Sequence, residues 1–159
     1  MIIISHRGNL EGPRSCKENS KEAIDEALNL NFDCEVDLWV DSSGELFIGH
    51  DNAEYPIDWN WLLERKESLW IHCKNLVALE RLSIKGENLN FFWHQSDDHV
   101  ITSKSVIWSY PGKPLSTRAI AVLPELHEPP DLAVLKEAYG ICTDYPLKFD
   151  RAINGRSLL

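Results

Sequence analysis

The sequence predicts an α/β fold, because short apolar segments alternate along the chain with segments that carry apolar residues at helical spacing. Seven apolar segments read as core strands, and strands that alternate with helices pair in parallel through right-handed crossovers. Seven strands suit a closed barrel of ~250 residues, but this chain has 159. We therefore predict one domain over residues 1–159, a compact or reduced TIM (β/α) barrel with shortened or missing helices in its second half. An open doubly wound sheet is the alternative.

The predicted strands are bounded by polar residues, Gly or Pro. They lie at 2–5, 33–40, 68–74, 90–95, 105–110, 118–124 and 140–146, and a hairpin arm at 45–51 returns from the second strand. Helices are predicted at 18–31, 58–67, 75–86 and 131–140, with Asp58 and Asn75 as starting caps. Residues 97–104 are predicted as a short helical turn and 151–159 as a helical fragment or disordered end. A loop at 110–117 is the clearest replacement of a helix.

Composition excludes several classes of protein. The net charge is -9 and the chain has no run of Lys or Arg, so neither nucleic acid nor an anionic membrane is an expected electrostatic partner. No apolar stretch is long enough to span a bilayer, and the N-terminus has no export signal. The four cysteines lack CxxC spacing, which favours reduced thiols. We expect a cytoplasmic protein without a transmembrane segment.

Two acids lie at alternate positions of the second predicted strand. Glu35 and Asp37 share one face of that strand, since side chains two apart point to the same side. Two neighbouring carboxylates repel one another, and a divalent cation such as Mg²⁺ or Ca²⁺ removes the repulsion. Solvated acids on an exposed strand face are the alternative interpretation.

Titratable groups also mark the ends of other predicted strands. His6 and Arg7 end the first strand, His50 ends the hairpin arm, and His72 and Lys74 share a face of the third strand. Two histidines can divide acid and base roles near neutral pH, and a guanidinium can contact two phosphate oxygens. Taken alone, His72 is more often a structural histidine than a ligand.

The order of these motifs resembles the glycerophosphodiester phosphodiesterase family, which belongs to the same superfamily as phosphatidylinositol-specific phospholipase C. The matching segments are HRG at 6–8, ENS at 18–20, EVD at 35–37, GHD at 49–51 and TDYP at 143–146. The resemblance covers the first ~75 residues and the last strand, in the sense of motif order used as a hypothesis. The middle of the chain is shorter than in the family.

The resemblance implies roles for individual residues. It makes His6 and His50 the general acid/base pair and places Arg7 and Lys74 on the phosphate. It assigns Glu35 and Asp37 to the metal, and Glu18 to a place in or beside the metal site.

One position departs from the family pattern. Where the family has a third metal carboxylate, this chain has His72. Imidazole shifts the preference of a site from Mg²⁺ or Ca²⁺ toward Mn²⁺ or Zn²⁺. Three hypotheses remain open: His72 is a ligand, another acid such as Glu125 replaces the missing one, or the site has lost catalysis.

The expected function is that of a metal-dependent phosphoric diester hydrolase. The resemblance implies a substrate that is a glycerophosphodiester-like small molecule or a lipid headgroup. Two alternatives are a lyase that forms a cyclic phosphate and an inactive barrel that binds phosphate ligands.

Overall fold

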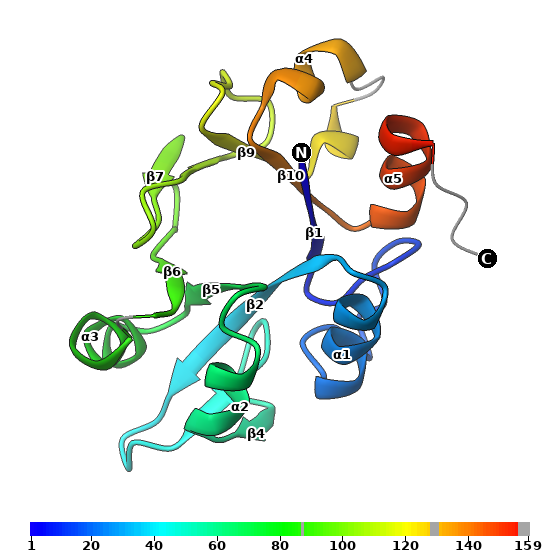
Figure 1. Ribbon diagram of the computed structural model, residues 1–159. Coiled ribbons are helices and arrows are strands. Elements are labelled where there is room, and N and C mark those ends of the chain that lie inside the picture. The colour runs from blue at the N-terminus through cyan, green and yellow to red at the C-terminus, as the bar shows by residue number, and fades with distance from the viewer. Residues whose placement is uncertain (87, 128–130, 156–159) are drawn as a thin grey trace.

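The computed structural model describes residues 1–86, 88–127 and 131–155, and its centre is a curled row of seven parallel strands (Figure 1). In spatial order the row is β6 (Asn90–Phe92), β5 (Leu69–Cys73), β2 (Asp33–Val40), β1 (Ile2–His6), β10 (Gly140–Thr143), β9 (Ala119–Val122) and β8 (Ile107–Ser109). The seven predicted core strands are therefore confirmed, β2 with the predicted bounds and the other six with shifted ones.

Three antiparallel strands extend this row. β3 (Leu46–Ile48) pairs with the end of β2, and β4 (Tyr55–Ile57) pairs with β3. β7 (His99–Ile101) pairs with β8. The prediction of a helical turn at 97–104 is wrong, because Val100 pairs with Trp108 and packs against the apolar interior.

The two ends of the row approach each other without a shared strand ladder. β7 forms the edge beyond β8, and among the described residues β6 is paired with neither of these two strands. Ser103, between β7 and β8, bridges the two ends: its backbone N–H donates to Phe91 at 2.8 Å, and its hydroxyl accepts from the Phe91 N–H at 3.0 Å. The sheet is thus curled, with a seam beside β6.

The helices lie outside the curl (Figure 1). They are α1 (Lys21–Asn29), α2 (Trp59–Glu64), α3 (Leu76–Lys85), α4 (Leu132–Glu137), α5 (Pro146–Asn154) and the short 3₁₀ helix η1 (Pro124–Leu126). Asp58 and Asn75 accept from the N–H groups of Trp61 and Ala78, as their predicted capping roles require. In the described part of the chain no helix connects β8 to β9, which confirms the predicted loop, and no helix is long and apolar enough to cross a membrane. The predicted tail lies partly in α5, and residues 156–159 are outside the described residues.

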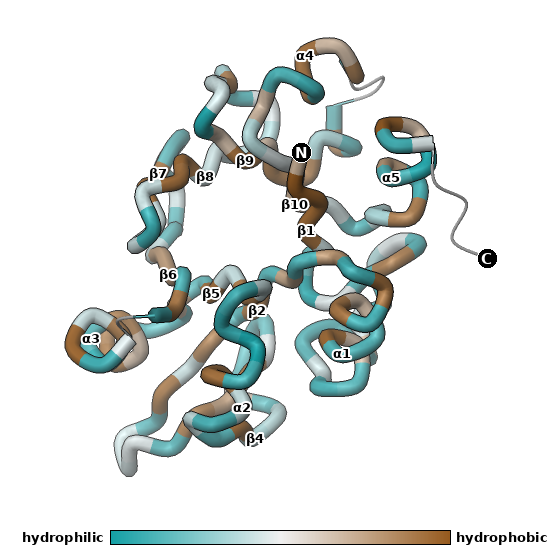
Figure 2. The backbone as a smooth tube through the Cα atoms, in the orientation of Figure 1, coloured by the Kyte–Doolittle hydropathy of each residue, from teal (hydrophilic) through white to brown (hydrophobic). Residues whose placement is uncertain are grey.

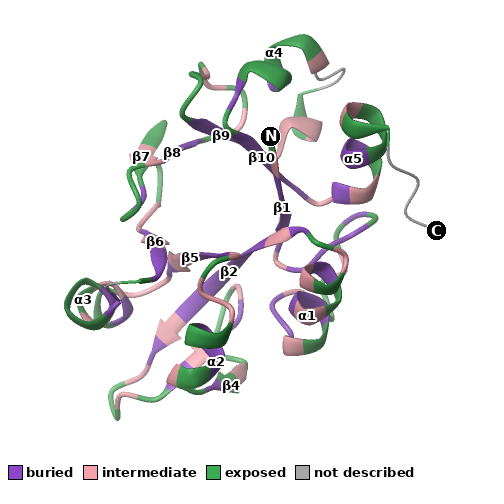
Figure 3. Ribbon diagram, viewed as in Figure 1, coloured by how far each residue is buried: buried purple, intermediate pink, exposed green. Residues whose placement is uncertain are grey.

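Alternation along the strands separates two apolar layers. Val36 and Leu38 of β2 pack with helix residues such as Ile24 and Leu82, on the outer face. The inner face has a separate cluster with no helical member: Ile4, Trp70, Phe92, Trp108, Ile120 and Cys142. The row of strands is largely buried, while α3 and α4 are largely exposed (Figure 3). Figure 2 shows that β1 is strongly hydrophobic at its start, and it ends in Ser5 and His6. Glu35 and Asp37 alternate along β2 with the outward-facing Val36 and Leu38, so the two acids point into the curl.

Gly8 makes the turn after β1 feasible, and replacing it by Ala is expected to destabilise the fold. Its φ is +79°, and a Cβ there would lie 2.7 Å from the backbone carbonyl carbon of Ala23 in α1. Positive φ and overpacking each cost about 1–3 kcal/mol, so we expect about 2–4 kcal/mol of lost unfolding free energy in urea. Gly155→Ala is the matched control, because Gly155 also has positive φ, +67°, but its Cβ would meet nothing within 4 Å. Equal losses in both variants would contradict the packing part of this explanation.

Candidate metal centre

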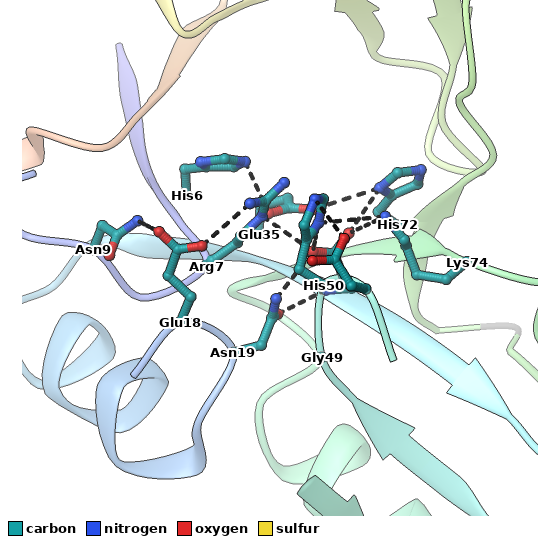
Figure 4. A network of polar contacts seen from close by, with 12 residues as sticks. His6, Arg7, Asn9, Glu18, Asn19, Glu35, Gly49, His50, His72 and Lys74 are labelled. Atoms are coloured by element: carbon teal, nitrogen blue, oxygen red, sulfur yellow. Dashed lines mark hydrogen bonds and ion pairs between the residues drawn. The ribbon is translucent and has the colours of Figure 1, made fainter. Parts of the chain in front are cut away.

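The carboxyl ends of three adjacent strands bring the predicted site residues together. β2 lies between β1 and β5, so that His6 pairs in register with Glu35, and Asp37 pairs with His72. Neighbouring residues in register on parallel strands share a face of the sheet. Figure 4 shows His6, Glu35 and His72 on one side of the sheet, together with His50 from the loop that follows β3.

The two acids of β2 are the most buried charged groups of this cluster. Glu35 is 3 % exposed and Asp37 is fully buried. Burial, together with the negative charge of Asp37, raises the pKa of Glu35. Burial by itself raises the pKa of Asp37, but hydrogen bonds from His50 and His72 outweigh it and, with two neighbouring cations, hold that pKa well below its ordinary value. The Oε2 atom of Glu35 is buried without a hydrogen-bond partner, so the pair has room for another cation.

His72 completes a set of metal donors. One ligand atom from each of Glu35, Asp37 and His72 lies within 4.8 Å of the others. The Nε2 atom of His72 lies 2.9 Å from the carbonyl oxygen of His94, which can only accept, so Nε2 carries a proton. Its Nδ1 lies 2.9 Å from the Oδ1 atom of Asp37 and donates to it, and a bound cation would take the place of that proton between the two atoms.

This arrangement of His72 is typical of a metal ligand. A ligating imidazole commonly donates its other N–H to a carbonyl or carboxylate, which fixes the ring and its tautomer. Phe92 stacks on the ring at 5.2 Å between centroids, with planes 1° apart, and restricts its rotation. The donor set of two carboxylates and one imidazole therefore fits a divalent cation, and of the predicted hypotheses this geometry favours His72 as the ligand.

Two permanent cations border the acids. The Nε atom of Arg7 lies 3.1 Å from Oδ2 of Asp37, without the alignment of a hydrogen bond, and its Nη1 donates to Glu18 at 3.2 Å. The Nζ atom of Lys74 lies 3.3 Å from Oδ1 of Asp37. Both side chains are mostly buried beside the acids, which places two positive charges at the border of the acidic pair.

Glu18, a predicted member of the metal set, lies beside the group of three donors. Its carboxylate accepts from Arg7 and, at 2.9 Å, from the side-chain amide of Asn9. Glu18 therefore orients Arg7, which is the outer role that the sequence hypothesis left open.

His6 is held by a carboxylate from the far end of the chain. Its Nδ1 donates to Oδ1 of Asp144 at 2.7 Å, and its Nε2 lies 3.9 Å from Glu35. Burial lowers the pKa of His6, but the hydrogen bond to Asp144 and the charge of Glu35 outweigh burial and raise it overall. Because Nδ1 is occupied, Nε2 is the atom available for proton exchange.

Asp144 is itself fixed by Glu125. One oxygen of Glu125 accepts from the backbone N–H of Asp144 at 2.8 Å and from the Thr143 hydroxyl at 2.9 Å. Glu125 is not part of the group of metal donors found in the described residues. It supports the partner of His6, and the hypothesis that it replaces the third metal acid has no support in this geometry.

His50 is the more accessible of the two histidines. Its side chain is 41 % exposed, and its Nδ1 lies 3.2 Å from Asp37 and 3.5 Å from the ammonium of Lys74. Gly49 before it has φ +156°, and the Gly49 carbonyl accepts from the Trp39 indole at 2.7 Å. Asp51 is 82 % exposed and 3.5 Å from Nε2 of His50, so it contributes mainly to the loop.

Sequence reasoning gave no role to Asn19, which the structure places against Asp37. Its side-chain amide donates to Asp37 Oδ2 at 3.0 Å, and its side-chain oxygen accepts from the Asp37 backbone N–H at 2.9 Å. Asn19 is fully buried with φ +58°, a conformation that Asn tolerates better than most residues. The sequence signal that could have indicated this role was the position of Asn19 in the ENS motif, directly after Glu18.

The fold and the site together define a class: an α/β protein with a curled parallel sheet and a buried Glu, Asp and His group, suited to a divalent cation, at the carboxyl ends of its strands. Comparison of the chain with protein-family models, with curated proteins and with solved structures found no match.

Proposed function

We propose that this protein is a metal-dependent phosphoric diester hydrolase built on a reduced (β/α) barrel. The observation that carries the proposal is the gathering of two histidines, two cations and a three-residue metal donor set at one end of the strands. Active sites of such barrels lie at this end of the strands. The motif order that resembles glycerophosphodiester phosphodiesterases supports the same substrate class, a glycerophosphodiester-like small molecule or lipid headgroup.

Glu35, Asp37 and His72 would hold the cation, whose positive charge stabilises the charge that develops on phosphoryl oxygens. Mg²⁺ and Ca²⁺ suit the two carboxylates, and Mn²⁺ and Zn²⁺ suit the imidazole. Arg7 and Lys74 would bind the remaining phosphate oxygens. Their side chains are already held by acids, so little ordering is needed when the substrate binds.

The two histidines would transfer the protons of the reaction. His6, with Nδ1 fixed on Asp144, exchanges a proton through Nε2. His50 lies at the more open side of the cluster, and it would exchange the second proton of the reaction with whichever of the two groups, nucleophile or departing alcohol, His6 does not serve. One imidazole removes a proton from the nucleophile, and the other protonates the departing alcohol.

The decisive experiment is a matrix of metals and substrates on chelator-treated protein. We expect inactive apoprotein, restored by a divalent ion, to release p-nitrophenol from bis(p-nitrophenyl) phosphate and alcohol from glycerophosphodiesters. Phosphorus NMR of the products separates hydrolysis from cyclic-phosphate formation. Metal binding by calorimetry without turnover of any phosphodiester would contradict the proposal and leave a binding protein.

His72→Glu tests the position that departs from the family pattern. A carboxylate in place of imidazole is expected to shift the activating metal from Mn²⁺ or Zn²⁺ toward Mg²⁺ or Ca²⁺, because hard cations prefer oxygen ligands. The readout is the relative affinity of the four ions by calorimetry, in parallel with activity. An unchanged order of affinities would remove His72 from the metal site.

A further inference from the structure

A cavity of about 460 Å³ lies at the amino ends of the parallel strands, opposite to the candidate metal centre. Four strands contribute their first or second residue to its wall. The inner wall contains Ile2, Asp33, Leu69, Trp70, Asn90 and Val106. Its size is in the range of sites that bind small molecules.

The inner wall of this cavity presents hydrogen-bond acceptors. Asp33 precedes Glu35 by two residues and shares its face of β2, but it lies at the other end of the curl. One carboxylate oxygen of Asp33 accepts from the Trp70 indole N–H at 2.9 Å. Asn90 is 9 % exposed, and its side-chain oxygen is buried without a hydrogen-bond partner. A buried amide without a partner is costly, so this wall is suited to a donor from a ligand.

The mouth of the cavity carries the opposite charge. Lys66, Lys104 and Glu67 line it, so that its net charge is positive, and the Lys66 ammonium lies 3.8 Å from the exposed Glu67 carboxylate. Between the acidic inner wall and the basic mouth, Ile2, Leu69 and Val106 provide apolar surface. The cavity therefore changes from negative and accepting inside to a net positive charge at its mouth, with apolar surface between.

We propose that this cavity binds a small zwitterion, with its ammonium group on Asp33 and Asn90 and its anionic group toward Lys66 and Lys104. An ammonium has three donors and forms strong charge-assisted hydrogen bonds with a carboxylate. A short methylene chain fits the apolar section, and a bare metal ion would leave most of the volume unfilled. The proposal is independent of the phosphodiesterase activity, since it uses none of the residues of the metal centre.

The test is a titration with 5-aminovalerate, using n-pentylammonium and valerate as probes that each lack one charge. We expect saturable binding of 5-aminovalerate and about tenfold or greater weakening with valerate, the usual scale for losing a charged hydrogen bond. Pentylammonium is expected to bind more weakly than 5-aminovalerate. Unchanged affinity after removal of either charge would overturn the proposal.

Two tryptophan indoles locate the binding site by NMR. The Trp70 N–H, bonded to Asp33, is expected to shift on titration, whereas the Trp39 N–H, bonded to Gly49 near the metal centre, is expected to stay. The reverse pattern would mean that the amine binds at the acids of the other end and would overturn the assignment. Trp70→Phe and Trp39→Phe variants assign the two signals.

Asp33→Asn provides the matching variant. Its side-chain oxygen can still accept from the Trp70 indole, so the fold should be retained while the charge is lost. We expect at least about tenfold weaker binding of 5-aminovalerate and no change in Asp51→Asn, an acid on an exposed loop. Wild-type affinity for 5-aminovalerate in a folded Asp33→Asn variant would contradict the proposal. If this variant fails to fold, the indole shifts of the wild-type protein still test the proposal.

Discussion

Asp37→Asn is expected to cost about 3–5 kcal/mol of unfolding free energy, the usual effect of leaving buried charges without their partner. Arg7 and Lys74 lie within 3.3 Å of this carboxylate, and His50 and His72 contact it as well. The substituted amide is isosteric but neutral, so these groups lose their common counter-charge. Urea unfolding measures the loss, and calorimetry is expected to show that metal affinity falls with it.

Asp51→Asn is the matched control for this prediction. Asp51 belongs to the same loop as His50 but is 82 % exposed. An exposed ion pair contributes about 0–1 kcal/mol, so this variant should unfold almost as the wild-type protein does. If Asp37→Asn were as stable as Asp51→Asn, Asp37 would not be the electrostatic centre of the site.

His6→Ala is expected to lower turnover of phosphodiesters by about 10²–10⁴-fold, which is the usual contribution of general acid–base catalysis. The side chain is positioned by Asp144 and has Nε2 directed toward the acids of β2. Loss of the imidazole removes the proton-exchanging atom while leaving the metal donors in place. We therefore expect kcat to fall while metal affinity changes little. His50→Ala should behave in the same way.

The control for the histidine variants is His99→Ala. His99 is exposed in β7 and its ring bonds the Pro114 carbonyl, so its removal should leave turnover unchanged. Near-normal activity in both His6→Ala and His50→Ala would refute the acid–base assignment, whatever the metal requirement of the protein.

Much of the architecture could be predicted because its signals are local. Strand alternation put Glu35 and Asp37 on one face, and the parallel order of strands then brought His6 and His72 beside them. β4 was not predicted, because the Pro56 within it is unfavourable in a strand interior. β7 was misread as helical, since its pairing with β8 depends on contacts that short polar segments do not reveal.

The partners of the site residues were harder to predict than the residues themselves. His6 and Asp144 are separated by 138 positions, and no spacing rule selects that carboxylate from the others. The hydrogen bond from His72 to the His94 carbonyl depends on where β6 ends, which strand propensity leaves uncertain by a few residues. Such contacts are fixed only by the assembled sheet.

The seam beside β6 lies close enough to the candidate metal centre to affect how His72 is held. Ser103 joins the two edges through a few hydrogen bonds, so the edges can separate by local fluctuation at less cost than a full strand ladder would impose. The His94 carbonyl lies two residues beyond the end of β6, so opening of this edge would displace it as well. Opening of the sheet edge would then weaken the hydrogen bond between the His94 carbonyl and the Nε2 proton of His72. The rate at which a bound ion exchanges would therefore depend on Ser103, which lies outside the candidate metal centre.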